Sequence, residues 1–357
     1  MNFTIPTQNI STILIEWYND NKRELPWRDI TDPYKIWISE IILQQTRVNQ
    51  GLNYYLRFIE RFPSVIELAQ AHEDEVLKYW QGLGYYSRAR NLHKAAQQIK
   101  SDFNGTFPQL HSQIIKLAGI GDYTAAAISS FAFNQPFAVV DGNVYRVLSR
   151  LFAIETPIDS STGKKEFSIL AGNLLPKFDS NIYNQAIMEF GALHCVPVSP
   201  DCTNCPLNAI CRAYELNIVS QLPVKSLKTK VTNRYFNYLF IEYQGLTFLQ
   251  KREAKDVWQN LYEFPLIETD KLLSIEELIN DSGFKRLFNG ISKVEIVHTT
   301  NPMKHILSHR VIFAQFISVQ VNELNKEFEK YCRIPIQEID KYAVSRLMEL
   351  FLEKINE

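Results

Sequence analysis

The sequence has little that points to a membrane, to secretion or to a repeat architecture. No apolar run approaches the roughly 20 residues that a membrane-spanning helix needs. The N-terminal stretch has no basic start followed by an apolar block, so no export signal is expected. The net charge of −1 does not by itself indicate nucleic-acid binding, although a local basic face is sufficient for it. We therefore expect a globular, cytoplasmic protein.

Cysteine is also scarce, and its placement is the most informative feature of the chain. Four of the five cysteines follow the spacing C-x6-C-x2-C-x5-C, at Cys195, Cys202, Cys205 and Cys211. A disulfide pair is disfavoured because no secretory signal precedes the chain. Four thiolates can bind either a structural zinc ion or an iron–sulfur cluster, and the spacing alone leaves both open. Cys332 lies far away and is expected to be a small buried apolar residue.

The two halves of the chain differ in their patterns. From about residue 8 to 216 apolar residues recur at helical spacing, with proline and glycine in the gaps, which predicts many short helices. The segment 217–234 carries four basic residues and no acid, so it is predicted to be a linker, either lying along a polyanion or merely solvated.

The last third, 235–357, is predicted to be a smaller α+β domain. Gln244-Gly245 between two apolar runs is typical of a hairpin turn. The expected strands are Tyr235–Tyr243, Leu246–Lys251, Lys293–His298 and Val311–Val321, and the expected helices are Ser274–Asp281 and Ala343–Lys354.

A glycine turn within about 110–130 predicts two helices joined by a tight hairpin. Gly119 and Gly121 allow another backbone to approach, and the free N–H groups that begin the next helix can hold a phosphate. Such a hairpin holds DNA without reading its sequence. Asp141 follows an apolar run 20 residues later. It is expected to be a helix N-cap, a buried functional carboxylate, or both.

Glu40 is the strongest candidate for an acid. If 36–45 is helical, three of the four neighbours one turn away are apolar, namely Ile36, Trp37 and Leu43. Such surroundings should raise the pKa of the Glu40 carboxyl and keep it protonated near neutral pH, which suits a general acid. A glutamate on a solvated helix face is the alternative.

These motifs resemble the helix–hairpin–helix-Gly-Pro-Asp DNA glycosylases. The likeness lies in 119–121 and 140–144, and the cysteine spacing is similar to the [4Fe–4S] loop of the endonuclease III and MutY types. The resemblance therefore implies a [4Fe–4S] cluster at the four cysteines. Two departures are Ala118, where proline is usual, and the loop 196–201, which lacks the usual basic residues.

Four longer segments are similar to adenine DNA glycosylases of the MutY type, and the match covers nearly all of 20–212. They are Leu25–Arg28, Asp32–Thr46, Trp80–Leu92 and Tyr183–Ala192. A lysine of the bifunctional relatives is replaced by Tyr123, which cannot form a Schiff base, so no lyase step is expected.

The resemblance implies a mechanism and a set of site residues. Glu40 would protonate a flipped adenine and Asp141 would stabilise the oxocarbenium sugar. Asn143 and Tyr123 would position these groups. The adenine pocket would be lined by Trp27, Arg28, Leu43 and Gln185. The gap in the base stack and the opposite base would be met by Gln45, Thr46, Leu83 and Tyr85.

Residues 235–357 resemble the MutT-like (Nudix) domain of the same family. No G-x5-E-x7-R-E-x2-E-E helix is present, so phosphohydrolase activity is not expected. The segment 305–310 resembles a loop that senses 8-oxoguanine, with Leu307 in place of the usual phenylalanine, followed by Ser308 and His309. An ordinary turn into a strand is the alternative.

The resulting hypothesis is a monofunctional, monomeric, bacterial adenine DNA glycosylase with three domain segments: 1–216, 217–234 and 235–357. Its partner would be duplex DNA with adenine opposite 8-oxoguanine or guanine. The rivals are an endonuclease III-like glycosylase and lyase for damaged pyrimidines, and a non-catalytic lesion-binding protein.

Overall fold

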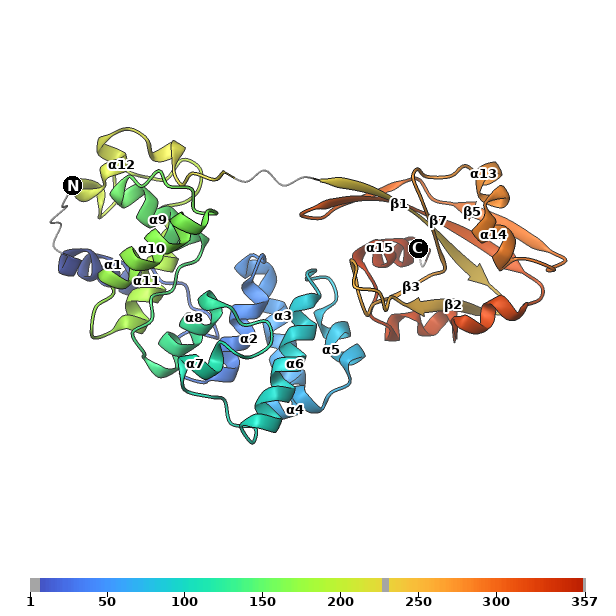
Figure 1. Cartoon of the computed structure of the whole chain (residues 1–357), viewed down its shortest axis with the longest axis horizontal. Coiled ribbons are helices and arrows are strands. Elements are labelled where there is room, and N and C mark those ends of the chain that lie inside the picture. The colour runs from blue at the N-terminus through green and yellow to red at the C-terminus, as the bar shows by residue number, and fades with distance from the viewer. Residues whose placement is uncertain (1–6, 227–230, 356–357) are drawn as a thin grey trace. The chain divides into compact units, whose positions relative to one another are not determined.

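The computed structural model describes residues 7–226 and 231–355, and its contacts divide the chain into two units (Figure 1). The first unit comprises 1–69 and 94–227, and the second comprises 70–93 and 228–357. Part of the predicted basic linker, 227–230, lies outside the described residues. None of the helices in the described ranges is both long and apolar enough to cross a membrane.

Residues 7–221 form helices joined by loops, as the periodicity predicted. The elements are α1 (Thr7–Asn21), α2 (Pro33–Leu43), α3 (Val48–Arg61), α4 (Val65–Gln70), α5 (Glu73–Trp80), α6 (Ser87–Asp102), α7 (His111–Ile114), α8 (Asp122–Phe133), α9 (Gly142–Phe152), α10 (Ser161–Leu174), α11 (Ser180–Leu193), η1 (Asn208–Ile210), α12 (Arg212–Glu215) and η2 (Val219–Gln221).

Helix α2 is buried on nearly all sides. It begins at Pro33, and the Asp32 carboxylate accepts hydrogen bonds from the Tyr34 and Lys35 amides, at 2.9 and 3.3 Å. Its residues from Ile36 to Ile42 are all buried. A helix that is apolar all round is a core helix, so any ionisable residue on it is removed from water.

The predicted glycine hairpin connects α7 to α8. Gly119 has φ +73°, a conformation that favours glycine, and Gly121 is the N-cap of α8. Because Gly121 and Asp122 are exposed, the N-terminal turn of α8 is open to a ligand. Replacement of the usual proline by Ala118 does not abolish the turn.

A close helix contact joins the start of α9 to α11. A Cβ atom on Gly191 would lie 2.7 Å from the Asn143 Cβ and 3.0 Å from the Asn143 carbonyl oxygen. The absence of a side chain at Gly191 therefore allows α9 to begin against α11. Behind this contact, α1, α9, α10 and α11 share one hydrophobic core.

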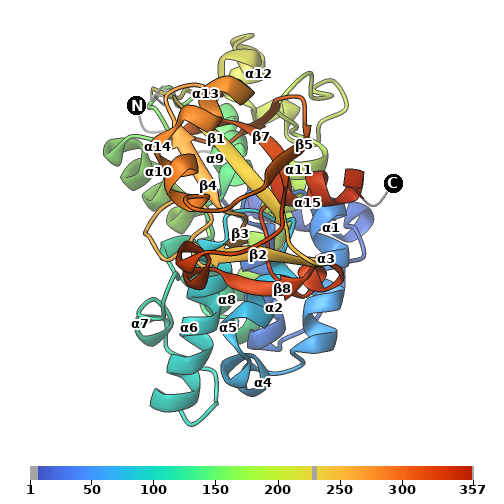
Figure 2. The same cartoon turned by 90° about the vertical axis from the view of Figure 1, so that its right-hand side faces the viewer.

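The second unit carries the predicted α+β architecture (Figure 2). Its larger sheet has the order β4-β1-β7-β5, with β6 also paired to β7, and a second sheet has the order β3-β2-β8. The strands are β1 (Thr232–Glu242), β2 (Leu246–Lys251), β3 (Tyr262–Glu263), β4 (Leu266–Thr269), β5 (Val294–Thr299), β6 (Met303–Ile306), β7 (Arg310–Val321) and β8 (Cys332–Pro335).

Side chains along the parallel strands β1 and β7 point alternately to the two faces of the sheet, and each face packs against its own hydrophobic cluster. Leu239 and Ile241 face a cluster that includes α13 (Ile275–Asn280) and α14 (Ser282–Leu287). The intervening Phe240 contacts aromatic rings that include Phe351 of α15 (Arg346–Ile355), with ring centroids 5.6 Å apart. Successive strand residues point to opposite faces, so both faces of the sheet are covered.

Segment 70–93 groups with the second unit although the predicted boundary placed it in the first domain. The cause is a set of polar contacts made by α5. The Asn260 amide donates to Glu73 at 2.6 Å, the Tyr262 hydroxyl donates to Asp74 at 3.1 Å, and Lys251 also pairs with Asp74. These contacts join residues about 180 positions apart, and nothing in the local pattern predicts them.

The prediction for Cys332 was wrong. This residue is exposed at the start of β8, with its sulfur 3.9 Å from the Tyr342 hydroxyl. The error arose because an isolated cysteine was treated as an apolar residue, whereas the exposed face of a short strand accepts it equally well.

The close approach at Gly191 can be tested by substitution. We expect Gly191→Ala to lower the free energy of unfolding by about 1–3 kcal/mol, because the added methyl group forces α9 from α11. Gly172→Ala, at an exposed position of α10, has no atom within 4 Å of the new Cβ and should be neutral or stabilising by about 0.5–1 kcal/mol. Urea unfolding measures both, and equal effects of the two substitutions would contradict the packing argument.

Candidate active site

The first unit contains a cavity of about 1060 Å³ that collects most of the predicted site residues. Its walls come from the segment before α2, from α2 itself, from the starts of α8 and α9, and from α11. The predicted residues that line it are Trp27, Arg28, Glu40, Leu43, Gln45, Thr46, Gly121, Tyr123, Asp141, Asn143 and Gln185. Residues far apart in sequence thus meet in one space.

Glu40 is the acid at the buried wall of this cavity. Its side chain projects from α2, only 7% of the residue is exposed, and the Tyr123 hydroxyl donates a hydrogen bond to Oε2 at 2.6 Å. Burial raises the pKa of Glu40 to about 7, although the hydrogen bond from Tyr123 acts in the opposite direction. The predicted raised pKa is confirmed, and a solvated position for Glu40 is excluded.

Asp141 is the N-cap of α9, and its half-buried side chain lines the cavity. It accepts hydrogen bonds from the backbone amides of Asn143 and Val144, at 2.9 and 2.8 Å, and from the Asn143 side chain at 2.7 Å. Burial raises the pKa of Asp141, while these hydrogen bonds stabilise its charged form. The N-cap expectation is therefore confirmed, and the functional role of the carboxylate stays a prediction.

An ion-pair cluster that sequence reasoning missed forms another part of the wall. Glu189 of α11 is 1% exposed and pairs with Arg23 at 2.6 Å and with Arg28 at 2.5 Å. Burial would raise the pKa of Glu189, but hydrogen bonds from the two arginines lower it to about 2. Glu189 thus stays ionised and fixes Arg28. The only local signal was a single acid within an otherwise uncharged helix.

The orientation of Gln185 is also set by a residue that was not predicted. The hydroxyl of Tyr18, on α1, donates to Gln185 Oε1 at 3.1 Å. This leaves the amide NH2 group of Gln185 as a donor toward a ligand. The same Tyr18 ring lies under the Arg28 guanidinium, 5.5 Å from the ring centroid.

Two arginines of α9 connect the cavity to the cysteine loop. Arg146 donates to the Asn143 side-chain oxygen at 2.8 Å and to the Cys195 carbonyl at 2.7 Å. Arg150 donates to Cys195 Sγ at 3.4 Å and to the Val196 carbonyl at 2.8 Å. The loop is therefore held by the helix that Asp141 caps.

The four cysteines line one small cavity of about 30 Å³. Burial raises the pKa of Cys205 to about 11, and the other three thiols add to this because like charges repel. Among the described residues, no three Cys, His, Asp or Glu side chains meet at a point where one ion would bind all of them. The thiols instead surround a space.

The predicted opposite-base residues divide between the two units. Gln45, with φ +56°, and Thr46 line the main cavity. Leu83 is only 7% exposed, and its role at the gap in the base stack stays a prediction. Tyr85 is 50% exposed and remains available. Gly119 supports the hairpin and is not among the residues that line the cavity.

Within the second unit, Tyr85 reaches the predicted sensing loop. Its hydroxyl lies 2.6 Å from the Ser308 hydroxyl oxygen. Ser308 and His309 are exposed and Leu307 is half-buried, in the turn between β6 and β7. The structure therefore groups Tyr85 with Ser308, a pairing that separate motifs did not predict.

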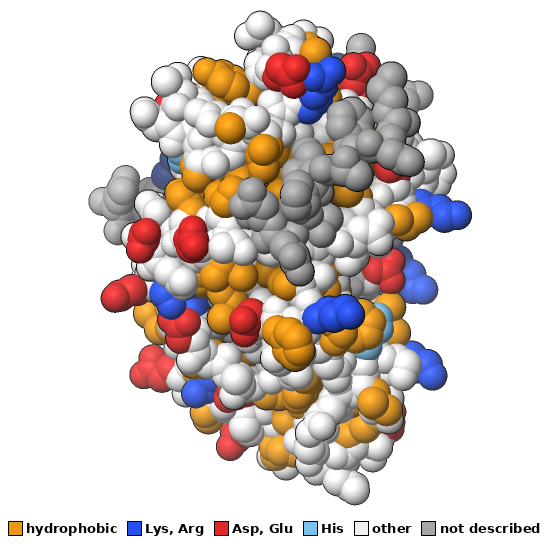
Figure 3. Space-filling view, turned by 90° about the vertical axis from the view of Figure 1, so that its left-hand side faces the viewer, with side chains coloured by type: hydrophobic (Ala, Val, Ile, Leu, Met, Phe, Trp, Pro, Cys, Tyr) orange, Lys and Arg blue, Asp and Glu red, His pale blue; other side chains and the backbone are white. Residues whose placement is uncertain are grey.

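The face of the molecule in Figure 3 carries both signs of charge with hydrophobic side chains between them. On the described residues of that face there is no continuous basic surface.

The raised pKa of Glu40 predicts how stability depends on pH. As the pH rises from 4.5 to about 7, the unfolded chain releases this proton before the folded chain does. The free energy of unfolding therefore falls by about 3 kcal/mol. Glu40→Gln cannot titrate, and its stability relative to wild type should rise by that amount between pH 5 and pH 8. Urea unfolding at both values measures the difference. Glu24→Gln, at an exposed position, is the control, and identical pH dependences for the two variants would contradict the burial argument.

Comparisons with known proteins agree with this architecture. Residues 38–170 match the model of the HhH-GPD superfamily of base excision DNA repair proteins, and residues 237–354 match a NUDIX domain. An adenine DNA glycosylase of Buchnera aphidicola subsp. Baizongia pistaciae is 36% identical over 316 residues, covering 87% of this chain and 86% of the relative.

Solved structures resemble the helical part. A thermostable thymine-DNA glycosylase superposes with a TM-score of 0.55 and 29% identity, covering 59% of this chain and 97% of the other. A trapped endonuclease III–DNA covalent intermediate superposes with a TM-score of 0.52 and 25% identity. The match covers 60% of this chain and 100% of the other. The likeness to both structures stops short of the whole chain, whereas that to the Buchnera relative spans most of it.

Proposed function

This chain belongs to the adenine DNA glycosylase family of base excision repair hydrolases, and from that membership we propose that it removes adenine opposite 8-oxoguanine, or opposite guanine, in duplex DNA. One observation carries the proposal. Two carboxyl groups with raised pKa values, Glu40 and Asp141, line the same cavity as Tyr123 and Gln185. Paired carboxyl groups are the usual means of cleaving a glycosidic bond.

The first chemical step assigned to this cavity is protonation of the base. Adenine leaves the duplex and enters the cavity, since the reacting bond is inaccessible within a base stack. Glu40 gives its proton to the purine, at N7, and the bond between N9 and the sugar C1′ breaks with its electron pair going to the base. An acid with a pKa of about 7 is protonated often enough near neutral pH and still donates readily.

The second step concerns the sugar. The cation that develops at C1′ is stabilised by the Asp141 carboxylate, which is held in place by Asn143 and by the amides that begin α9. Water then adds to C1′, and the proton that it releases returns the acid to its starting state. The products are free adenine and an abasic site.

The base would be held by the residues of the adjoining wall. Trp27 packs edge-on against Tyr55, with centroids 5.0 Å apart, and offers an apolar face together with Leu43. Arg28 and the Gln185 amide supply donors to the ring nitrogens of adenine. Their orientations are fixed by Glu189 and Tyr18, so little ordering is needed when the base binds.

The reaction is proposed to stop at the abasic site. Tyr123 occupies the position of the lysine nucleophile in bifunctional relatives, and phenols do not form Schiff bases. The lining also contains Lys164, an exposed residue of α10. Since the rival pyrimidine-lesion enzyme would cut the strand through an amine, strand cutting before alkali treatment separates the two hypotheses.

The cysteine loop fits a [4Fe–4S] cluster, which we propose as the resident cofactor. The four thiols line one small cavity, and four thiolates are the ligand set of a [4Fe–4S] cluster. Cys195, Cys202, Cys205 and Cys211 would hold it. The group supplies cross-links between four positions of the chain and takes no part in the acid–base steps.

The opposite base is proposed to be read by the second unit. Ser308 and His309 present exposed hydrogen-bonding groups at the β6–β7 turn, and Tyr85 adds an exposed aromatic ring beside Ser308. 8-Oxoguanine carries an oxygen at C8 and a proton at N7, where guanine has only an acceptor. Donors and acceptors at a fixed turn can distinguish the two. Leu307 provides an apolar contact in place of an aromatic one.

Base release under single-turnover conditions tests the proposed activity. Wild type should release adenine opposite 8-oxoguanine and guanine and not opposite thymine, with strand cutting only after alkali. Glu40→Gln should slow release by a factor of about 10²–10⁴, because the proton donor is lost, whereas Glu24→Gln should match wild type. If cluster-loaded wild type releases no adenine, the activity proposal fails and a binding module becomes the better account.

The role of Tyr123 predicts a shift of the pH profile. The hydrogen bond from Tyr123 lowers the pKa of Glu40, so Tyr123→Phe should raise that pKa above about 7. The fall of the single-turnover rate at alkaline pH should therefore move to higher pH. Tyr145→Phe, in the same cavity but without a bond to Glu40, should leave the profile in place. A shift in the opposite direction would show that Glu40 is not the titrating acid.

A further inference from the structure

The turn that carries Ser308 and His309 is fixed by backbone hydrogen bonds on two sides. The Leu307 amide donates to the Arg310 carbonyl at 2.8 Å, which closes the hairpin between β6 and β7. The Thr232 amide donates to the His309 carbonyl at 3.1 Å, which joins the turn to the first residue of β1. The main chain of the turn is therefore held from within the hairpin and from the neighbouring strand.

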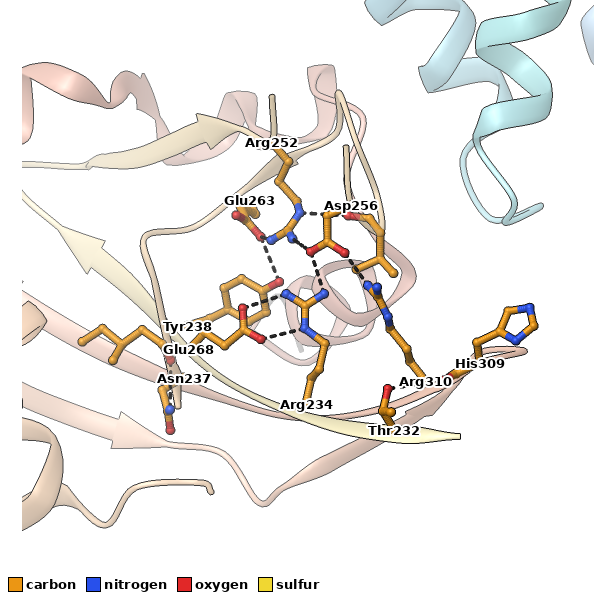
Figure 4. Close-up of polar contacts among 12 residues, drawn as sticks. Thr232, Arg234, Asn237, Tyr238, Arg252, Asp256, Glu263, Glu268, His309 and Arg310 are labelled. Carbon is orange, nitrogen blue, oxygen red and sulfur yellow. Dashed lines mark hydrogen bonds and ion pairs between the residues drawn. The ribbon is translucent and has the colours of Figure 1, made fainter. Parts of the chain in front are cut away.

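A charge cluster holds the same turn from a third side (Figure 4). Asp256, in the loop between β2 and β3, pairs with three arginines that come from different segments. Its Oδ2 accepts from Arg234 at 2.6 Å and from Arg252 at 3.0 Å, and its Oδ1 accepts from Arg310, the residue that follows His309. One carboxylate thus connects β1, the β2–β3 loop and the start of β7.

The three arginines do not depend on Asp256 equally. Arg234 forms a second, two-bond pair with Glu268, at 2.6 and 2.7 Å. Arg252 is also paired with Glu263, at 2.6 Å. Among the ion pairs of the described residues, Arg310 has Asp256 alone as its carboxylate. Loss of the Asp256 charge would therefore release Arg310 first.

The surroundings of Asp256 keep its side chain ionised and paired with the arginines. Burial would raise the pKa of Asp256, but hydrogen bonds from Arg234, the Val257 amide and Arg310 lower it to about 2. The side chain is 22% exposed, so the pairs are partly shielded from water and salt. The carboxylate remains ionised throughout the pH range in which a glycosylase works.

We propose that Asp256 is a positioning residue for lesion discrimination, which holds Arg310 and thereby fixes the Ser308–His309 turn in the geometry that separates 8-oxoguanine from guanine. The inference rests on the proposed function of that turn. The two bases differ by the oxygen at C8 and by a hydrogen that lies on N7 in place of C8, and such a difference is read best by groups whose positions are fixed before binding. In this role Asp256 acts through Arg310, its ion-pair partner, and takes no part in the chemical step.

The test uses the full-length, cluster-loaded protein and two duplexes that carry a non-cleavable adenine analogue, 2′-fluoro-deoxyadenosine, opposite 8-oxoguanine or guanine. Asp256→Asn should reduce the ratio of the two binding constants about tenfold, through weaker binding of the 8-oxoguanine duplex. Single-turnover release from saturated adenine–guanine duplex should be unchanged. Glu268→Gln, which removes a carboxylate from Arg234 but not from Arg310, is the matched control and should keep the ratio.

Arg310→Gln provides a second route to the same result if Asp256→Asn folds poorly. It leaves Asp256 paired with Arg234 and Arg252 and should lower the ratio to the same extent. If Arg310 served only as a phosphate contact, both duplexes would bind more weakly by the same factor and the ratio would stay constant. That result would overturn the inference, as would an unchanged ratio in Asp256→Asn.

The double substitution Ser308→Ala/His309→Ala separates failure of the inference from failure of its premise. If this variant keeps the wild-type ratio, the turn does not read the lesion and the proposed function of the second unit fails. If it loses discrimination while Asp256→Asn and Arg310→Gln keep it, the turn reads the lesion without help from Asp256, and only the positioning role is wrong.

Discussion

The active site depends on the removal of one carboxyl group from water. Glu40 sits on a helix whose residues from Ile36 to Ile42 are all buried, and this burial raises its pKa to about 7. Other residues of the cavity shift the pKa of Glu40 in either direction. Tyr123 lowers the pKa of Glu40 by hydrogen bonding, and Asp141 raises it by its charge. A solvated α2 would leave an ordinary glutamate that is ionised at neutral pH and has no proton to give.

The sequence was sufficient for the features that short motifs encode. The apolar neighbours of Glu40 predicted its burial, the apolar run before Asp141 predicted a helix start, and Gln244-Gly245 predicted a hairpin that has φ +52° and +76°. The sequence did not predict contacts between residues that are far apart along the chain and meet only in the folded protein. The contacts of Glu189 with Arg23 and of Tyr18 with Gln185 each join residues more than 160 positions apart.

The sequence did not predict the exposure of side chains whose burial depends on tertiary context. Leu83 and Tyr85 occupy one turn and were given the same role, yet one side chain is 7% exposed and the other 50%. Cys332 was assigned to the core by its residue type and lies on the surface. The sequence did not identify Asp256 as part of a charge cluster, because its three arginine partners come from separate strands and loops. Charge clusters of this kind have no periodicity to reveal them.

The ion-pair cluster of Glu189 with Arg23 and Arg28 also affects the electrostatic potential along the cavity. Two guanidinium groups and one carboxylate leave an excess positive charge at one wall, and the Arg28 charge lowers the pKa of Glu40. The Asp141 carboxylate lies at another wall. A positive charge is therefore least stable beside the arginines and most stable beside Asp141. This gradient gives the cavity a polarity, and in the proposed reaction it favours the orientation that directs the developing cation of the sugar toward Asp141.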